Sequence, residues 1–144
     1  MLLKDVMTRG VECVGPGDTI QAAARKMRDL DVGPVPVCGT DGKLAGMLTD
    51  RDIAIRAVAD GRDSKTCEVQ DVMTPEVVYC FDDQPVEEAE RVMKEKQIRR
   101  LLVLNRDKRL VGIVSLGDLA LRTGDREQTG EVLHEVSEPS MSAH

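Results

Sequence analysis

The segment Leu44–Asp52 has the sequence LAGMLTDRD. It carries an apolar run through a glycine into a threonine, and a carboxylate follows three residues later. The pattern returns at Leu110–Asp118 as LVGIVSLGD. A short apolar run predicts a buried strand, and Thr or Ser followed three residues later by an acidic residue predicts the capped start of a helix. Each copy therefore predicts a strand that leads directly into a helix.

The two copies belong to a longer internal repeat. The tetrapeptide Asp-Val-Met-Thr at residues 5–8 recurs at residues 71–74, which is 66 residues later. The same offset holds without a gap as far as Arg56 and Arg122. Chance does not keep one register over so many positions, so the chain is a tandem duplication.

Hydrophobic periodicity and turn residues predict the same order of elements in each copy: strand, helix, strand, strand, helix. The first helix of copy one is expected to open at Asp18, with Gln21 completing a capping box, and that of copy two has Pro85 at its first position. The second helices start at Thr49 and Ser115. The predicted strands are residues 12–14, 35–38 and 43–48 in the first copy and 77–80, 101–104 and 109–114 in the second.

The last two strands of each copy are joined by short polar turns and should form hairpins. The crossover helix makes the first two strands parallel neighbours. We therefore expect an α+β fold of two β-α-β-β-α repeats packed with pseudo-twofold symmetry. The predicted boundaries are residues 1–60 for repeat 1, 61–67 for a linker, 68–123 for repeat 2, and 124–144 for a polar, mobile tail.

Composition excludes several classes of protein. The 144 residues are 41% apolar but contain one Phe, one Tyr and no Trp, so the core must be aliphatic. The formal charge of −6 argues against a nucleic-acid-binding role. No apolar run has the length of a membrane span, and Met1 is not followed by a leader pattern. We expect a cytoplasmic protein.

Catalytic and metal-binding constellations are absent from the sequence. The four cysteines form no Cys-x-x-Cys pair, and the only histidines are His134 and His144 near the C-terminal end. No metal site is therefore expected. Without a Ser/His/Asp or Cys/His set, we expect no enzyme activity.

Two β-α-β-β-α copies, each opened by Asp-Val-Met-Thr and closed by Gly-x-x-Thr/Ser-x-x-Asp, resemble a pair of CBS domains, also called a Bateman module. The resemblance covers roughly residues 1–123. It implies a stand-alone regulatory module that binds AMP, ADP, ATP or S-adenosylmethionine in clefts between the repeats. No obligatory cofactor is implied. The module would be a homodimer packed through helices and would signal to a separate effector protein.

The resemblance also assigns roles to residues. Thr49 with Asp52, and Ser115 with Asp118, would contact ribose or phosphate. This chemistry is reasonable, since a carboxylate accepts the hydroxyls of a ribose and a hydroxyl beside free helix N–H groups suits a phosphate oxygen. The same spacing is also that of a plain helix cap. Both interpretations stay open, and they are compatible.

Further positions follow from the same resemblance. Arg99 or Arg100 would neutralise a phosphate; the alternative is that both arginines are simply solvated. Copy one has Gly33-Pro34 at the matching positions, so the two clefts should differ. Backbone groups around Val35 and Leu101 would read the adenine edge. Two alanines would leave room for the sugar and base, although alanine on a helix is also a packing residue; they are Ala23 and Ala89.

The cysteines gain one possibility from this fold. If the first two strands are parallel neighbours, Cys13 and Cys38 lie within disulfide reach, and the alternative is two reduced thiols. The competing function is a ligand-independent stress-response or protein-interaction scaffold, with Cys13 and Cys38 as a redox element.

Overall fold

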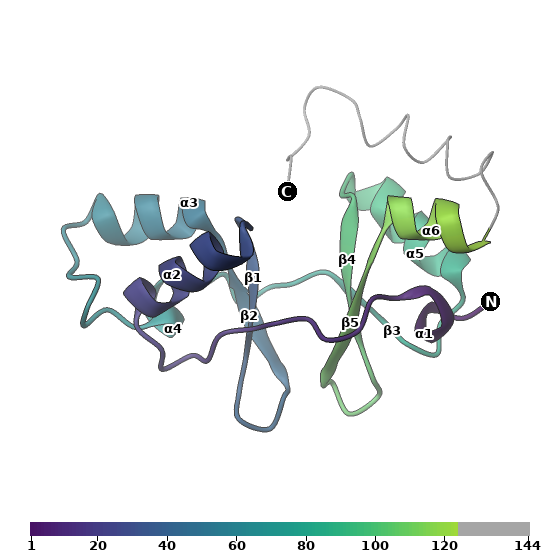
Figure 1. Ribbon diagram of the computed structural model, residues 1–144, viewed down its shortest axis with the longest axis horizontal. Coiled ribbons are helices and arrows are strands. Elements are labelled where there is room, and N and C mark those ends of the chain that lie inside the picture. Colours follow the sequence, from purple (N-terminus) through teal and green to yellow (C-terminus); the bar gives the residue numbers. More distant parts are fainter. Residues whose placement is uncertain (124–144) are drawn as a thin grey trace. The chain divides into compact units, whose positions relative to one another are not determined.

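The computed structural model describes residues 1–123, so the predicted mobile tail at 124–144 lies outside the described residues. The chain divides into two compact units (Figure 1). The central unit is Glu12–Val77. The terminal unit combines Met1–Val11 with residues 78–123.

The central unit contains one hairpin of strands with helices packed on it. Strands β1 (Val35–Cys38) and β2 (Leu44–Leu48) are antiparallel, as predicted. A single parallel bridge joins Val14 to Val37, so the expected first strand is reduced to one residue. The helices of this unit are α2 (Ile20–Leu30), α3 (Asp50–Asp52), the π-helix η1 (Ile53–Val58) and α4 (Val69–Val72).

The terminal unit contains a three-stranded sheet in the order β3-β4-β5. Strand β3 (Tyr79–Phe81) runs parallel to β4 (Arg100–Leu104), and β4 is antiparallel to β5 (Leu110–Ser115). This confirms the predicted crossover and hairpin. The helices of this unit are α1 (Leu3–Val6), α5 (Val86–Lys96) and α6 (Leu116–Thr123).

Three local predictions need correction. Helix α2 is capped by Thr19, whose Oγ1 accepts a hydrogen bond from the Ala22 N–H at 3.1 Å, whereas Asp18 accepts from the Gly15 N–H at 2.8 Å. Pro85 is the N-cap of α5 and lies outside its first turn. The sequence predicts a short turn at each Asp-Val-Met-Thr segment, but the short helices α1 and α4 extend into these segments and end at Val6 and Val72.

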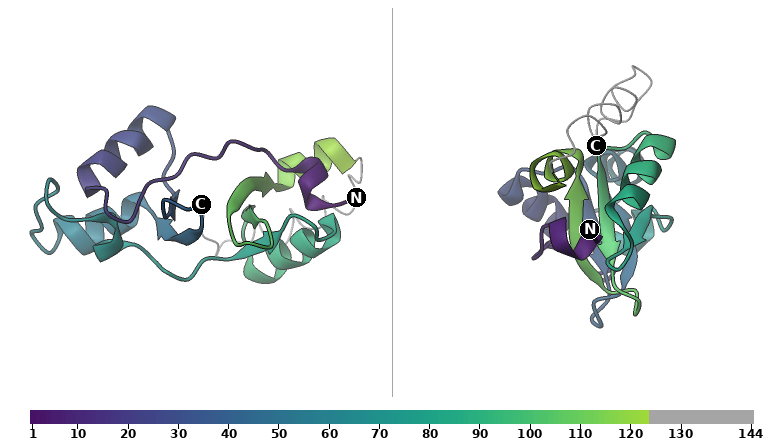
Figure 2. Two further views of the ribbon diagram at one scale, coloured as in Figure 1. Left: turned by 90° about the horizontal axis from the view of Figure 1, so that it is seen from below. Right: turned by 90° about the vertical axis from the view of Figure 1, so that its right-hand side faces the viewer.

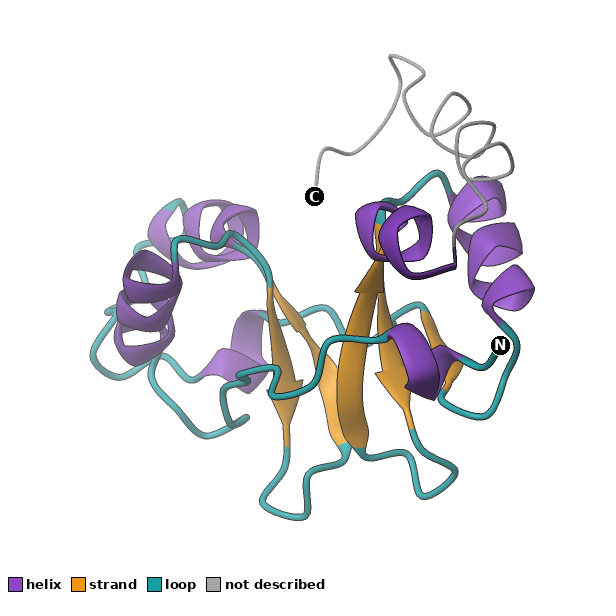
Figure 3. Ribbon diagram, turned by 45° about the vertical axis from the view of Figure 1, so that its right-hand side comes forward, coloured by secondary structure: helices purple, strands orange, loops and turns teal. Residues whose placement is uncertain are grey.

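Both cores are aliphatic, as the composition predicts, but the units do not follow the sequence repeats. Val69 and Val72, from the opening of repeat 2, are buried in the core of the central unit. Leu3 and Val6, from the opening of repeat 1, are buried in the terminal unit. Each opening segment therefore completes the unit that holds the rest of the other repeat. Figures 2 and 3 show α1 beside the strands of the terminal unit.

The predicted linker at residues 61–67 is part of the central unit. Cys67 is 6% exposed, and its carbonyl accepts from the Ile20 N–H at 3.0 Å. The Ser64 carbonyl accepts from the Gln21 N–H at 3.1 Å. These bonds satisfy N–H groups at the start of α2, which have no partner inside the helix.

Each opening segment docks on a strand at a glycine. In the terminal unit, Thr8 and Ile113 exchange two backbone hydrogen bonds of 2.8 and 3.0 Å. In the central unit, Thr74 and Met47 do the same at 2.8 and 2.9 Å. A Cβ at Gly46 would lie 2.7 Å from the Thr74 carbonyl oxygen. The glycine of the repeated motif is therefore needed for close approach of the backbone.

This close approach predicts the effect of Gly46→Ala. The added methyl must push the Thr74 carbonyl away, so we expect stability to fall by about 1–3 kcal/mol, the usual cost of overpacking. Urea denaturation followed by circular dichroism measures the shift in midpoint. Gly17→Ala is the control, since its Cβ would make an ordinary contact of 3.7 Å with Glu68 Oε1. Equal midpoints for the two variants would contradict the docking account.

Candidate functional site

The two Thr/Ser-x-x-Asp motifs form the same reciprocal hydrogen bonds at the end of a strand. Thr49 Oγ1 accepts from the Asp52 N–H at 3.0 Å, and Asp52 Oδ2 accepts from the Thr49 N–H at 3.0 Å. Ser115 Oγ and Asp118 Oδ2 form the equivalent pair, both bonds being 3.1 Å. The capping interpretation is thus confirmed in both copies. It places a hydroxyl and a carboxylate side by side in each unit.

The cap leaves part of the Asp52 carboxylate unused. Oδ2 carries the capping bond, while Oδ1 lies 3.9 Å from Nε of Arg56, one helical turn further on. The Asp52 side chain is 12% exposed, so this charge is partly shielded from water. Because Oδ1 of Asp52 makes only this long ion pair with Arg56, it is available to accept hydrogen bonds from a ligand.

The second motif lies next to two arginines. Arg100 is the cross-strand partner of Ser115 in the β4–β5 ladder. The carbonyl of Arg99 accepts from the Leu116 N–H, the first of helix α6, at 3.1 Å. Both arginines are exposed. The structure thus brings the arginine pair to the strand end that carries Ser115, and a phosphate contact by Arg99 or Arg100 stays a prediction.

Near the first motif, a carboxylate lies next to the position that matches Arg99. Gly33 stands where copy two has Arg99, and a Cβ on Gly33 would lie 3.2 Å from Asp50 Oδ1. Asp50 is exposed, and the same oxygen accepts from the Arg51 N–H at 3.0 Å. In copy two its counterpart is the buried Leu116. The alignment of the repeats contains this difference, but no local signal in the sequence places Asp50 near Gly33.

The remaining predicted site residues are core residues. Ala23 and Ala89 have 0% exposure and pack in the cores of their units, which supports the packing interpretation, while their contact with a sugar stays a prediction. Their position on the buried face of an amphipathic helix accounts for this burial. The side chains of Val35 and Leu101 are also buried, and their backbones pair with Leu48 and Val114.

The helix after Thr49 departs from α geometry. The Ala59 N–H bonds to the Ala54 carbonyl, and the Arg62 N–H to the Ala57 carbonyl, each five residues back and each at 3.0 Å. Its counterpart α6 is an α-helix. The sequence carries no signal for this difference. Such π-turns are rare and often accompany functional sites.

The structure brings Cys13 and Cys38 into contact. The Cys13 thiol lies close enough to influence the Cys38 thiol, and all four cysteines are free. Burial, assisted by the neighbouring Cys13, raises the pKa of Cys38 to about 12. Burial also raises the pKa of Cys80 to about 11. At neutral pH both of these groups are protonated thiols.

Across residues 1–123, no group of three or more His, Cys, Asp or Glu side chains is placed to hold a metal ion. No helix within the same range is both long and apolar enough to cross a bilayer.

The repeated fold and its paired motifs define a class of protein. The family model described as CBS domain matches residues 3–58 and again 69–122. The chain therefore belongs to the CBS-domain family and is a tandem CBS module with an α+β fold.

Relatives of the same length exist. The CBS domain-containing protein YhcV of Bacillus subtilis is 45% identical over 135 residues, 94% of both chains. Hypoxic response protein 1 of Mycobacterium tuberculosis is 43% identical over 117 residues, 81% of both chains. A crystal structure of Hypoxic Response Protein I with two coordinated zinc ions has a TM-score of 0.74 at 41% identity, covering 84% of this chain and 98% of that one.

Two further solved structures were determined with ligands. CBSX2 in complex with AMP has a TM-score of 0.71 at 25% identity, covering 88% of this chain and 98% of that chain. The CBS domain pair of MJ0100, in complex with 5'-methylthioadenosine and S-adenosyl-L-methionine, has a TM-score of 0.67 at 27% identity. It covers 86% of this chain and 100% of that one.

Proposed function

We propose that this chain is a regulatory module that binds adenosine-containing ligands through its Thr49–Asp52 and Ser115–Asp118 motifs and signals to a separate effector protein. One observation carries the proposal: each motif holds a hydroxyl and a carboxylate together at a helix start. A carboxylate accepts hydrogen bonds from ribose hydroxyls, and a hydroxyl beside helix N–H groups suits phosphate. The neighbours that carry AMP or S-adenosylmethionine support this chemistry.

The charges near the two motifs favour different ligands. Arg99 and Arg100 beside Ser115 favour a phosphorylated nucleotide, AMP, ADP or ATP, because guanidinium groups bind phosphate oxygens. Asp50 near Gly33 disfavours phosphate at the first motif. It favours adenosine or the cationic sulfonium of S-adenosylmethionine there. In both cases the adenine edge would be read by backbone groups near Val35 and Leu101.

The proposed module is cytoplasmic, is not an enzyme and needs no obligatory cofactor. It works as a homodimer packed through helices. Exposed apolar side chains on a helix of the central unit support this: Ile55 and Val58 of η1 are 55% and 67% exposed. Covering such side chains is the usual driving force of association.

Isothermal titration with AMP, ATP, adenosine and S-adenosylmethionine tests the ligand assignment. We expect Arg100→Ala to weaken AMP and ATP about tenfold or more, since a hydrogen bond to a charged group contributes about 1.5–3 kcal/mol. Adenosine affinity should change little. Arg28→Ala, which removes an exposed arginine on α2, is the matched control. Absence of binding by all four compounds at millimolar concentration would reject the proposal.

Substitution by asparagine separates the two motifs in the same titration. Asparagine keeps a side-chain oxygen for the cap while removing the charge, so the helix start is retained. Asp52→Asn should weaken S-adenosylmethionine, and Asp118→Asn should weaken ATP. If each variant weakens both ligands equally, the assignment of different ligands to the two motifs is wrong.

Light scattering after size exclusion tests the dimer. Ile55→Glu places a charge in the apolar helix surface and should convert a dimer into a monomer at micromolar concentration, because burying an unpaired charge is costly. Thr40→Glu introduces the same charge on the exposed turn between β1 and β2 and should leave the dimer intact. A monomeric parent protein, or a dimeric Ile55→Glu variant, would contradict this arrangement.

The contact between Cys13 and Cys38 favours a second candidate, a ligand-independent interaction scaffold with a redox element. Here the two thiols react with a low-molecular-weight disulfide. One thiolate attacks it to form a mixed disulfide, and the second displaces the remaining thiol. The Cys13–Cys38 bond forms, the small disulfide is reduced to two thiols, and atoms and electrons balance.

Thiol counting after treatment with oxidised glutathione tests this candidate. The reduced chain has four free cysteines, and oxidation should leave Cys67 and Cys80 as the two that react after unfolding. Cys38→Ser should prevent that loss, whereas Cys67→Ser should still lose two thiols. Four reactive thiols in the oxidised parent protein would reject the redox element.

A further inference from the structure

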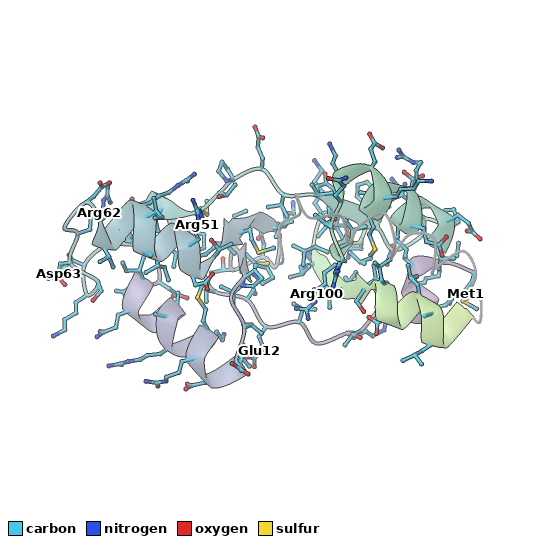
Figure 4. All side chains as sticks on the ribbon, turned by 90° about the horizontal axis from the view of Figure 1, so that it is seen from above. Met1, Glu12, Arg51, Arg62, Asp63 and Arg100 are labelled. Atoms are coloured by element: carbon cyan, nitrogen blue, oxygen red, sulfur yellow. The ribbon has the colours of Figure 1, made fainter. Side chains whose placement is uncertain are left out.

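An open hollow of about 410 Å³ lies against helix α2 in the central unit. It shares no lining residue with the Thr49–Asp52 motif. Its size falls within the range of small-molecule sites, about 300–1,000 Å³. Figure 4 shows Glu12, which lines the hollow, beside α2. The lining side chains are Glu12, Val14, Asp18, Ala22, Arg25, Lys26, Asp29 and Leu30.

The second repeat shows why this hollow is open. Arg91, the counterpart of Arg25, bonds to Glu88 with Nε–Oε2 at 3.2 Å and to Glu95 with Nη1–Oε2 at 2.6 Å. In the first repeat, Ala22 replaces Glu88. Its methyl lines the hollow where the longer carboxylate would lie.

Arg25 consequently keeps its hydrogen-bonding capacity. The counterpart of Glu95 is Asp29, which pairs with Arg28 at 3.1 Å. Within residues 1–123, Arg25 has no recorded ion pair or hydrogen bond. Its neighbour Lys26 donates one bond, from Nζ to the Cys13 carbonyl at 2.9 Å, and retains two donors. One side of the hollow thus offers a guanidinium and an ammonium group.

Carboxylates line the same hollow. Glu12 is exposed and, over the described range, has no recorded partner. Asp18 and Asp29 also face the hollow, although each already accepts one hydrogen bond, from Gly15 and Arg28 respectively. Apolar surface between these charges comes from Val14, Ala22 and Leu30.

We propose that this hollow binds a small aliphatic α-amino acid. Its carboxylate would bind Arg25 and Lys26, its ammonium group would bind Glu12 and Asp29, and its side chain would cover the apolar lining. Both charges of a zwitterion find an opposite charge here. A phosphate would face three carboxylates, and a simple amine would leave the two cations unpaired, so the mixed lining selects the zwitterion.

The inference is independent of the adenosine ligand. The hollow lies beside residues 12–14, whose Val14 bridges to β1. An amino acid would join this segment to α2 through Glu12 and Arg25. Failure of amino-acid binding would leave the adenosine proposal untouched, because the two sites share no residue.

Titration of ¹⁵N-labelled full-length protein with L-leucine, without nucleotide, tests the proposal. Amide shifts should be confined to residues 12–18 and 22–30, with saturation near about 10 mM or below. Isoamylamine and 4-methylpentanoate, which each lack one charge, should bind at least about tenfold more weakly. Inorganic phosphate should not produce the same shifts. Equal binding by phosphate or by either analogue would overturn the zwitterion assignment.

The variant Ala22→Glu gives the sharpest control. It restores at residue 22 the carboxylate that pairs with arginine in the second repeat, on an exposed helix position where glutamate is well tolerated. We expect it to fold normally and to weaken leucine at least about tenfold. Arg25→Gln should do the same, and Arg91→Gln in the other unit should change nothing. Unaltered leucine binding by Ala22→Glu, or no leucine shifts in the parent protein, would refute the site.

Discussion

The structure depends on the docking of each Asp-Val-Met-Thr segment against a glycine in a strand. At Gly46 the Thr74 carbonyl lies so close that a side chain there would overlap it. At Gly112 a Cβ would meet the Thr8 carbonyl at 2.9 Å and Met7 Sδ at 2.6 Å. The two strands involved, β2 and β5, run directly into Thr49 and Ser115. Docking of the opening segments therefore helps to fix the positions of the two strands that carry the hydroxyls of Thr49 and Ser115.

The two copies share the same packing but carry different charges. Both copies retain the cap, the docking glycine and an aliphatic core. They differ in the charged residues near the two Thr/Ser-x-x-Asp motifs. Gly33 corresponds to Arg99, and Asp50 to Leu116. A third difference, Ala22 for Glu88, leaves Arg25 of the first repeat unpaired within the described part of the chain. The two units thus share their packing and differ in electrostatics.

Local features of this fold follow from the sequence because they depend on neighbouring residues. The hairpins come from short apolar runs with polar turns, and the caps at Thr49 and Ser115 from a hydroxyl three residues before a carboxylate. The predicted start of α2 is one residue early, since Asp18 and Thr19 are both good caps. Here Asp18 bonds to the preceding turn.

Features that depend on distant contacts do not follow from the sequence. A repeat with constant offset is compatible with two arrangements: each opening segment can pack in the unit of its own repeat or in that of the other repeat. No local signal in the sequence therefore predicts that Leu3 is buried in the terminal unit. The burial of Ala23 was open between packing and ligand contact for the same reason. Amphipathic periodicity predicts which helix face is buried, but not how far a small side chain lies from a ligand.

Amide hydrogen exchange, measured on the full chain and on a variant that lacks residues 1–8, tests the segment exchange most directly. The Ile113 N–H bonds to the Thr8 carbonyl, and the Met47 N–H to the Thr74 carbonyl. We expect the deletion to abolish protection at Ile113 and to leave Met47 protected, because the two amides report on different units. Loss of protection at Met47 with Ile113 unchanged would show that each repeat keeps its own opening segment and would contradict the account.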